Sequence, residues 1–204
     1  MPGAKDWRAI FIRRARFGLA LLVFLTNACV TTPGDRAITL YGGRYTDNSL
    51  PEEIIWLKPI HYEDSWIAVA AYSEVFSRPE ISRYWAYEGQ VVKHSGDQQH
   101  WEYNALVLHR WTHFSWDDRV RTSFAIGDGL SWATQVPALE ESSRTNRNAT
   151  QLLNYVLFEV TLGLPRLEYI DLVGRIHHRS GVLGLFDNVR GGSNIISLGF
   201  RYEF

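Results

Sequence analysis

The last residues of the chain, Ser-Asn-Ile-Ile-Ser-Leu-Gly-Phe-Arg-Tyr-Glu-Phe at 193–204, alternate between apolar and polar side chains. Successive side chains of a β-strand point to opposite faces, so residues two apart share a face. The stretch therefore predicts a strand with one polar face and one aliphatic and aromatic face. The apolar face consists of Ile196, Leu198, Phe200, Tyr202 and Phe204.

The same alternation recurs along most of the chain. Few windows repeat apolar residues at helical spacing without a Gly or β-branched interruption, and no helix is predicted. The pattern predicts eight strands, each longer than the ~5 to 6 residues of an ordinary globular strand and close to the ~9 to 11 that cross a bilayer at a tilt. Their ranges are 35–46, 64–77, 82–94, 99–113, 118–132, 150–163, 168–180 and 193–204.

Two architectures fit such strands. A soluble sandwich would bury the apolar faces and expose the charged ones. Strand length, the even strand number and the wealth of Trp and Tyr instead favour an all-β, eight-stranded antiparallel transmembrane β-barrel of the outer-membrane type, which has no open edge in lipid. The charged faces would then fill a narrow lumen as a salt-bridge network. Its candidate members are Glu88, Glu102, Arg110, Arg121, Glu159, Asp171 and Arg175.

The N-terminus has the layout of a secretory signal peptide, with basic residues before an apolar run at 17–25 and then small or polar residues. That run is too short for a transmembrane helix, which needs ~20 residues. Ala28-Cys29 resembles the end of a lipoprotein signal, although Thr26 stands where Leu is usual. Cleavage nearby without lipidation and lipidation of Cys29 are both open. We expect a signal peptide at 1–29 and a single barrel domain at 30–204.

Composition narrows the function classes. The 204 residues carry a formal net charge of -1, which gives no support for nucleic-acid binding because that needs a basic face. Cys29 is the one cysteine, so no disulfide can form within the chain.

The C-terminal strand resembles the signature of bacterial outer-membrane barrels, where a terminal aromatic residue and alternating apolar residues are read by the insertion machinery. We therefore expect that machinery as a partner and the Gram-negative outer membrane as the location. Such barrels keep short turns on the periplasmic side and longer loops outside. The long predicted loops at 47–63, 133–149 and 181–192 place the end of the seventh strand near the outer-leaflet rim, where lipopolysaccharide lies.

That seventh strand carries the main functional clue. His178 and Ser180 share a face with Ile176, so a base and a hydroxyl nucleophile lie on an otherwise apolar wall. A Ser hydroxyl becomes a good nucleophile when a neighbouring base takes its proton, and His has a suitable pKa near neutrality. Asn194 on the neighbouring last strand shares this parity and is the candidate to orient His178.

Here the chain resembles the outer-membrane lipid A deacylases of the PagL type. His178-Arg179-Ser180 matches their His-x-Ser motif, and the resemblance concentrates in residues 150–204. It implies an esterase that removes an acyl chain from the lipid A of lipopolysaccharide, without a cofactor or metal, through Ser180, His178 and Asn194. Asn194 stands where the family has Glu, and Gly181 stands where it has Asn. Backbone amides of Gly181, Gly184 or Gly192 are candidate oxyanion donors.

The other histidines are not predicted to take part in catalysis. His177 has the opposite parity and is predicted to hydrogen-bond in the lumen. The remaining ones lack metal-ligand spacing, so no metal site is predicted; they are His61, His94, His100, His109 and His113. Glu140 and Glu141 lie in a predicted external loop and are candidates either for lipopolysaccharide contact or for plain solvation.

Two rival functions stay open at this point. One is a non-catalytic outer-membrane barrel with a structural or lipopolysaccharide-interacting role and a degenerate site, which the missing acid favours. The other is a soluble periplasmic binding β-barrel, which requires the apolar strand faces to point inward.

Overall fold

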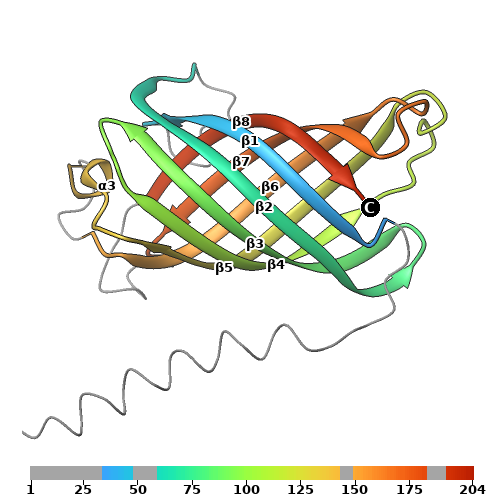
Figure 1. Ribbon diagram of the computed structural model, residues 1–204, viewed down its shortest axis with the longest axis horizontal. Coiled ribbons are helices and arrows are strands. Elements are labelled where there is room, and N and C mark those ends of the chain that lie inside the picture. The colour runs from blue at the N-terminus through green and yellow to red at the C-terminus, as the bar shows by residue number, and fades with distance from the viewer. Residues whose placement is uncertain (1–33, 48–58, 143–148, 183–191) are drawn as a thin grey trace, which may run out of the picture. The chain divides into compact units, whose positions relative to one another are not determined.

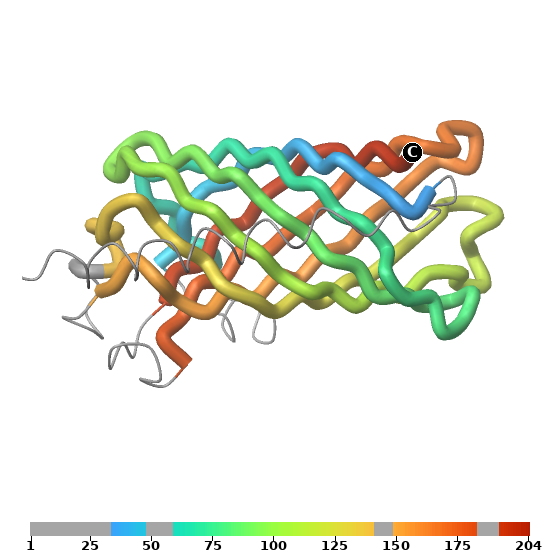
Figure 2. Tube along the Cα trace, turned by 60° about the horizontal axis from the view of Figure 1, so that its bottom comes forward, coloured from blue at the N-terminus to red at the C-terminus, as the bar shows by residue number. Residues whose placement is uncertain are grey.

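The computed structural model describes residues 34–47, 59–142, 149–182 and 192–204. The predicted signal peptide, Cys29 and Gly184 lie outside these ranges. Within them the chain forms a closed antiparallel barrel in which each strand pairs with its sequence neighbours and β8 closes onto β1 (Figures 1 and 2). The strands are β1 Arg36–Thr46, β2 Tyr62–Glu80, β3 Arg83–Gly96, β4 Trp101–Trp111, β5 Arg121–Ala133, β6 Leu152–Gly163, β7 Ile170–Ser180 and β8 Gly192–Glu203.

The predicted fold class, an eight-stranded antiparallel barrel of the outer-membrane type, is confirmed, and most strand ends lie within two or three residues of their predicted positions. The end of β2 and the start of β5 each lie three residues from their predicted positions. Before β5, the residues preceding Arg121 form a turn in which Val120 N donates to Trp116 O at 3.2 Å. A second difference is the short helix α3, Ala138–Ser142, in a loop where no helix was predicted.

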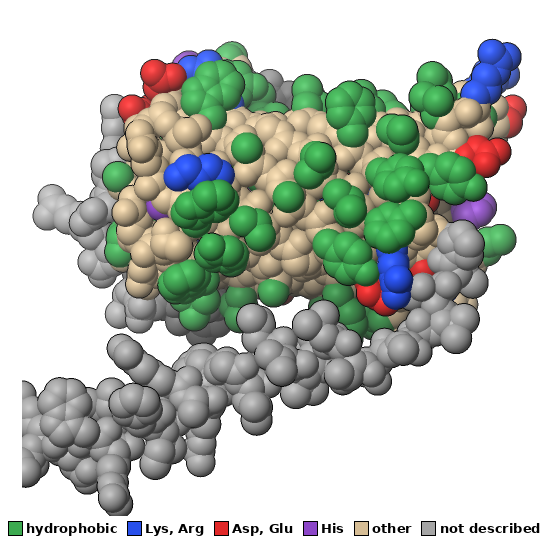
Figure 3. Space-filling model, in the orientation of Figure 1, with side chains coloured by type: hydrophobic (Ala, Val, Ile, Leu, Met, Phe, Trp, Pro, Cys, Tyr) green, Lys and Arg blue, Asp and Glu red, His purple; other side chains and the backbone are tan. Residues whose placement is uncertain are grey.

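The outer wall of the barrel is apolar. Leu198 is 67% and Phe200 is 63% exposed, and large apolar side chains cover the face seen in Figure 3, while charged side chains lie toward the two ends. A soluble binding barrel would bury these side chains, so its requirement of inward apolar faces is not met. In the described part of the chain, no helix is long and apolar enough to cross a membrane.

The lumen is filled by side chains. Arg175 Nη1 donates to Glu88 Oε1 at 2.7 Å, Arg175 also pairs with Glu159, and Glu159 pairs with Arg110. These four side chains are at most 4% exposed, so the predicted luminal salt-bridge network is present. Arg121 and Asp171 form a further pair, in which the Arg121 side chain is 31% exposed.

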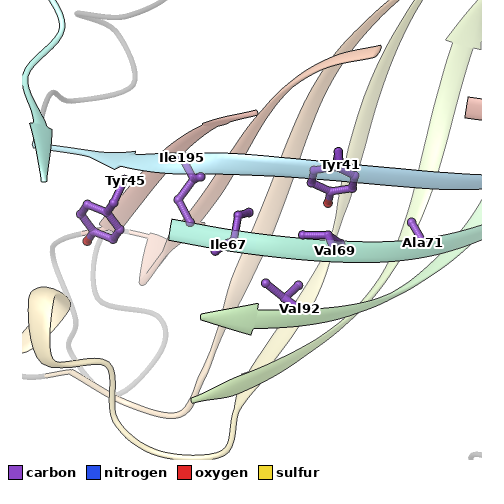
Figure 4. Close-up of a cluster of buried hydrophobic side chains, with 7 residues drawn as sticks. All are labelled: Tyr41, Tyr45, Ile67, Val69, Ala71, Val92 and Ile195. Atoms are coloured by element: carbon purple, nitrogen blue, oxygen red, sulfur yellow. The ribbon is translucent and has the colours of Figure 1, made fainter. Parts of the chain in front are cut away.

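An apolar cluster fills part of the lumen toward the end that carries α3 (Figure 4). Leu139 of α3 packs against this cluster. The helix thereby lies over the same barrel end at which β7 ends and β8 begins (Figure 1). The cluster consists of Tyr41, Tyr45, Ile67, Val69, Ala71, Val92 and Ile195.

Candidate functional site on the outer wall

The pairing of β7 with β8 assembles the predicted site residues. His178 lies directly opposite Asn194, and Ser180 lies directly opposite Gly192. His178 and Ser180 are half-buried on the outer wall, whereas Arg179 between them is buried in the lumen. The strand parity used in the sequence prediction therefore gives the observed arrangement.

A hydrogen bond holds the imidazole in place. His178 Nδ1 lies 2.6 Å from Asn194 Oδ1. An amide oxygen can only accept, so Nδ1 carries the proton and Nε2 is left as the basic nitrogen. Asn194 is 3% exposed and His178 is held beside it, which is the orientation that a general base requires.

Gly192 lies close to both His178 and Ser180, and the absence of a side chain avoids crowding them. A Cβ built on Gly192 would lie 3.1 Å from His178 Cε1 and 3.3 Å from Ser180 Cβ. The described residues show no hydrogen bond between His178 and Ser180. Such bonds often tighten only when substrate binds. Any side chain at position 192 would press on both His178 and Ser180.

We expect Gly192→Val to lower any catalysis at this site strongly. The new side chain would press on His178, and its Cβ would lie 2.4 Å from Arg179 O, so the β7–β8 pairing beside His178 would have to shift. A loss of at least about 100-fold in ester hydrolysis follows from displacing the reacting groups by about 1 Å. The measurement is hydrolysis by purified, folded variants. Gly89→Val is the matched control, because a Cβ on Gly89 meets nothing within 4 Å; equal activity of the two variants would contradict the assignment.

Two polar residues beside this site were missed by the sequence reasoning. Asn154 on β6 lies directly opposite Ser180, and its Nδ2 donates to Asp128 Oδ1 at 2.9 Å and to Gly129 O at 3.1 Å. The sequence could have shown both Asn154 and Asp128, since each is a polar residue on a strand face that otherwise carries apolar side chains. Asp128 does not replace the missing acid, because Val156 lies between it and His178 in the register.

The luminal side of the site is held by α3. Glu140 Oε1 accepts from Arg179 Nη1 and from Ser193 Oγ, both at 2.7 Å. Burial raises the pKa of the Glu140 carboxyl, and the Arg179 guanidinium opposes this shift. Both sequence hypotheses for Glu140, lipopolysaccharide contact and solvation, are wrong because it is buried. Glu140 instead joins β7 to β8 directly behind His178 and Ser180.

The remaining predicted residues are placed as follows. His177 is fully buried in the lumen, as predicted, with Nδ1 3.3 Å from the Tyr155 hydroxyl. Gly181 is buried just after β7, and the orientation of its amide as an oxyanion donor stays a prediction. His94 and His100, which the sequence predicted to lack metal-ligand spacing, lie side by side, with ring centroids 4.0 Å apart.

A cavity of about 430 Å³ opens at the other barrel end, away from Ser180. Its lining includes Arg78, Arg110 and Arg121 together with Asp117 and Asp171. This polar cavity is not lined by His178 or Ser180, so it is separate from the cluster on the outer wall.

Fold and outer wall together define the class: an eight-stranded β-barrel of the outer-membrane type with a His/Ser/Asn cluster on its outer surface. No protein-family model and no curated protein matches the chain. Among solved structures, it is similar to the outer membrane enzyme PagL, with a TM-score of 0.57, 10% identity and coverage of 82% of this chain and 99% of that one. It is also similar to Neisserial surface protein A, with a TM-score of 0.51, 11% identity and coverage of 85% and 100%. At these identities the similarity shows the fold.

Proposed function

We propose that this chain is an outer-membrane esterase that hydrolyses an ester-linked acyl chain of lipid A. The observation that carries the proposal is the His178 Nδ1 to Asn194 Oδ1 hydrogen bond of 2.6 Å, beside Ser180, on a barrel wall whose large exposed side chains are mostly apolar. Polar and ionisable groups facing lipid are costly and are by default functional candidates. The resemblance of His178-Arg179-Ser180 to the His-x-Ser motif supplies the substrate class.

The chemistry follows from the geometry. Ser180 Oγ attacks the ester carbonyl carbon while His178 Nε2 accepts the hydroxyl proton. The tetrahedral oxyanion collapses, the acyl chain stays on Ser180, and His178 returns the proton to the departing sugar hydroxyl. Water, activated by the same imidazole, then releases the fatty acid. This mechanism uses no cofactor.

The position of the site suits a lipid substrate. His178 and Ser180 lie at the barrel end with the long connections, which in this class of barrel is the external side. Their wall neighbours are apolar side chains that an acyl chain can lie along, including Ile176 and Val156. We propose the outer leaflet of the outer membrane as the location, lipopolysaccharide as the partner, and insertion through the C-terminal strand.

The second candidate is a non-catalytic barrel that contacts lipopolysaccharide through the same wall. The observation in its favour is Asn194, since an amide stabilises an imidazolium less than a carboxylate does. The esterase and the non-catalytic barrel are distinguished by incubating the purified, folded barrel in detergent with lipopolysaccharide and measuring the 3-hydroxy fatty acid that is released. Release supports the esterase. A folded barrel that binds lipopolysaccharide and releases nothing supports the alternative.

Restoring a carboxylate should raise activity. Asn194→Asp keeps the side-chain size and places an acceptor oxygen on His178 Nδ1, where a charged acceptor adds roughly 1 kcal/mol, or about 5- to 10-fold in rate. Asn194→Leu removes the acceptor and should lower the rate by a similar or larger factor. The measurement is fatty-acid release by each purified variant. If Asn194→Asp lowers the rate as much as Asn194→Leu does, Asn194 does not orient His178.

A further inference from the structure

A second cluster lies inside the barrel, on the hairpin formed by β3 and β4. His94 N donates to His100 O at 3.0 Å, so the two histidines face each other across the hairpin, and Glu102 follows two residues later on the same face. All three side chains are at most 3% exposed. Their candidate ligand atoms lie within 4.8 Å of one another.

The hydrogen bonding of this cluster is incomplete. His94 Nε2 lies 2.9 Å from Glu102 Oε2, yet His94 Nδ1 and both ring nitrogens of His100 are buried without a hydrogen-bond partner in the described part of the chain. Burying an imidazole nitrogen without a partner costs folding free energy. His100 in particular supplies a lone pair that nothing in the described protein uses.

We propose that His94, His100 and Glu102 bind one Zn²⁺ ion inside this end of the barrel. Two imidazoles and one carboxylate form a donor set that zinc takes with a water molecule as fourth ligand. The ring centroids lie 4.0 Å apart with an interplanar angle of 15°, so binding one ion requires the two side chains to rotate. This site shares no residue with the proposed esterase cluster.

The surroundings support a cation despite a nearby arginine. Arg179 Nε lies 3.7 Å from Glu102, which opposes metal binding, but Arg179 is itself paired with Glu140. His177 Nε2 lies 2.9 Å from Glu102 Oε1, although neither atom makes a hydrogen bond within the described residues. Zinc would therefore bind a carboxylate that is flanked by His177 and Arg179, the residues on either side of His178 in the sequence.

The test is zinc binding by untagged, refolded barrel in detergent, measured by competition with a chromophoric chelator. We expect one ion per chain in the wild type. His100→Gln, which changes a residue outside the strands, should weaken affinity at least about 100-fold, since even outer-shell changes cost 10- to 100-fold. Glu102→Gln should weaken it likewise. His109→Gln is the control, because the His109 ring instead packs against Trp85 in a tilted contact and against Trp111 edge-on.

Equal zinc affinity of wild type and His100→Gln, or no binding by the wild type at micromolar zinc, would overturn the proposal. Wild-type barrel loaded with Co²⁺ gives a test that needs no variant. Intense visible absorption bands of a four- or five-coordinate site, displaced by zinc, support the proposal. The weak spectrum of hydrated Co²⁺ overturns it.

Discussion

Ser180→Ala is expected to lower the release of fatty acid from lipopolysaccharide at least about 1,000-fold, because it removes the attacking oxygen and leaves only binding and oxyanion contacts. His178→Gln should lower the rate of fatty-acid release by a similar factor, since the nucleophile and the base act as one unit. The measurement is the initial rate with purified barrels in detergent, after each variant has been shown to fold.

Ser197→Ala is the matched control for Ser180→Ala. Ser197 lies on β8 but is 2% exposed and faces the lumen, so its loss leaves the outer wall unchanged. Its activity should remain within about 2-fold of the wild type, as is usual for changes away from a site. If Ser180→Ala and Ser197→Ala were equally active, Ser180 would not be the nucleophile.

Arg175→Met should produce the largest loss of stability. Arg175 is 2% exposed and pairs with both Glu88 and Glu159, so its removal leaves two carboxylates in a closed lumen with less positive charge to balance them. Breaking a buried ion pair in this way costs about 3 to 5 kcal/mol. The measurement is denaturant unfolding of the refolded barrel, followed by tryptophan fluorescence.

Arg36→Met is the control for this loss. Arg36 pairs with Glu74 at 3.6 Å, but their side chains are 37% and 32% exposed, so the pair contributes under about 1 kcal/mol. Unfolding of Arg175→Met at the same denaturant concentration as Arg36→Met would mean that the luminal network does not stabilise the barrel.

Much of the barrel can be predicted from the sequence because strand alternation is a local property. The parity of 193–204 places Phe200 outside and Arg201 inside, and the structure agrees. The same parity, counted across one hairpin, brings Asn194 to His178. Each of these predictions needs only the two-residue period and the pairing of neighbouring strands.

What could not be predicted depends on contacts across the barrel or on turn geometry. Glu140 is buried because α3 folds over the barrel end and meets Arg179, a partner far away in sequence. His94 and His100 meet because the turn between β3 and β4 sets the register of these two strands. Only a correct placement of that turn around Gly96 would have predicted that the two histidines face each other. The close approach of Gly192 to His178 and Ser180 depends on atomic positions on both strands.

The most direct test of the proposed activity is mass spectrometry of lipid A from Gram-negative cells that produce either the wild type or Ser180→Ala, with both proteins shown to be folded in the outer membrane. The proposed mechanism predicts that lipid A loses one ester-linked 3-hydroxyacyl chain in the presence of the wild type and keeps it with Ser180→Ala. Identical lipid A spectra from the two strains would contradict it.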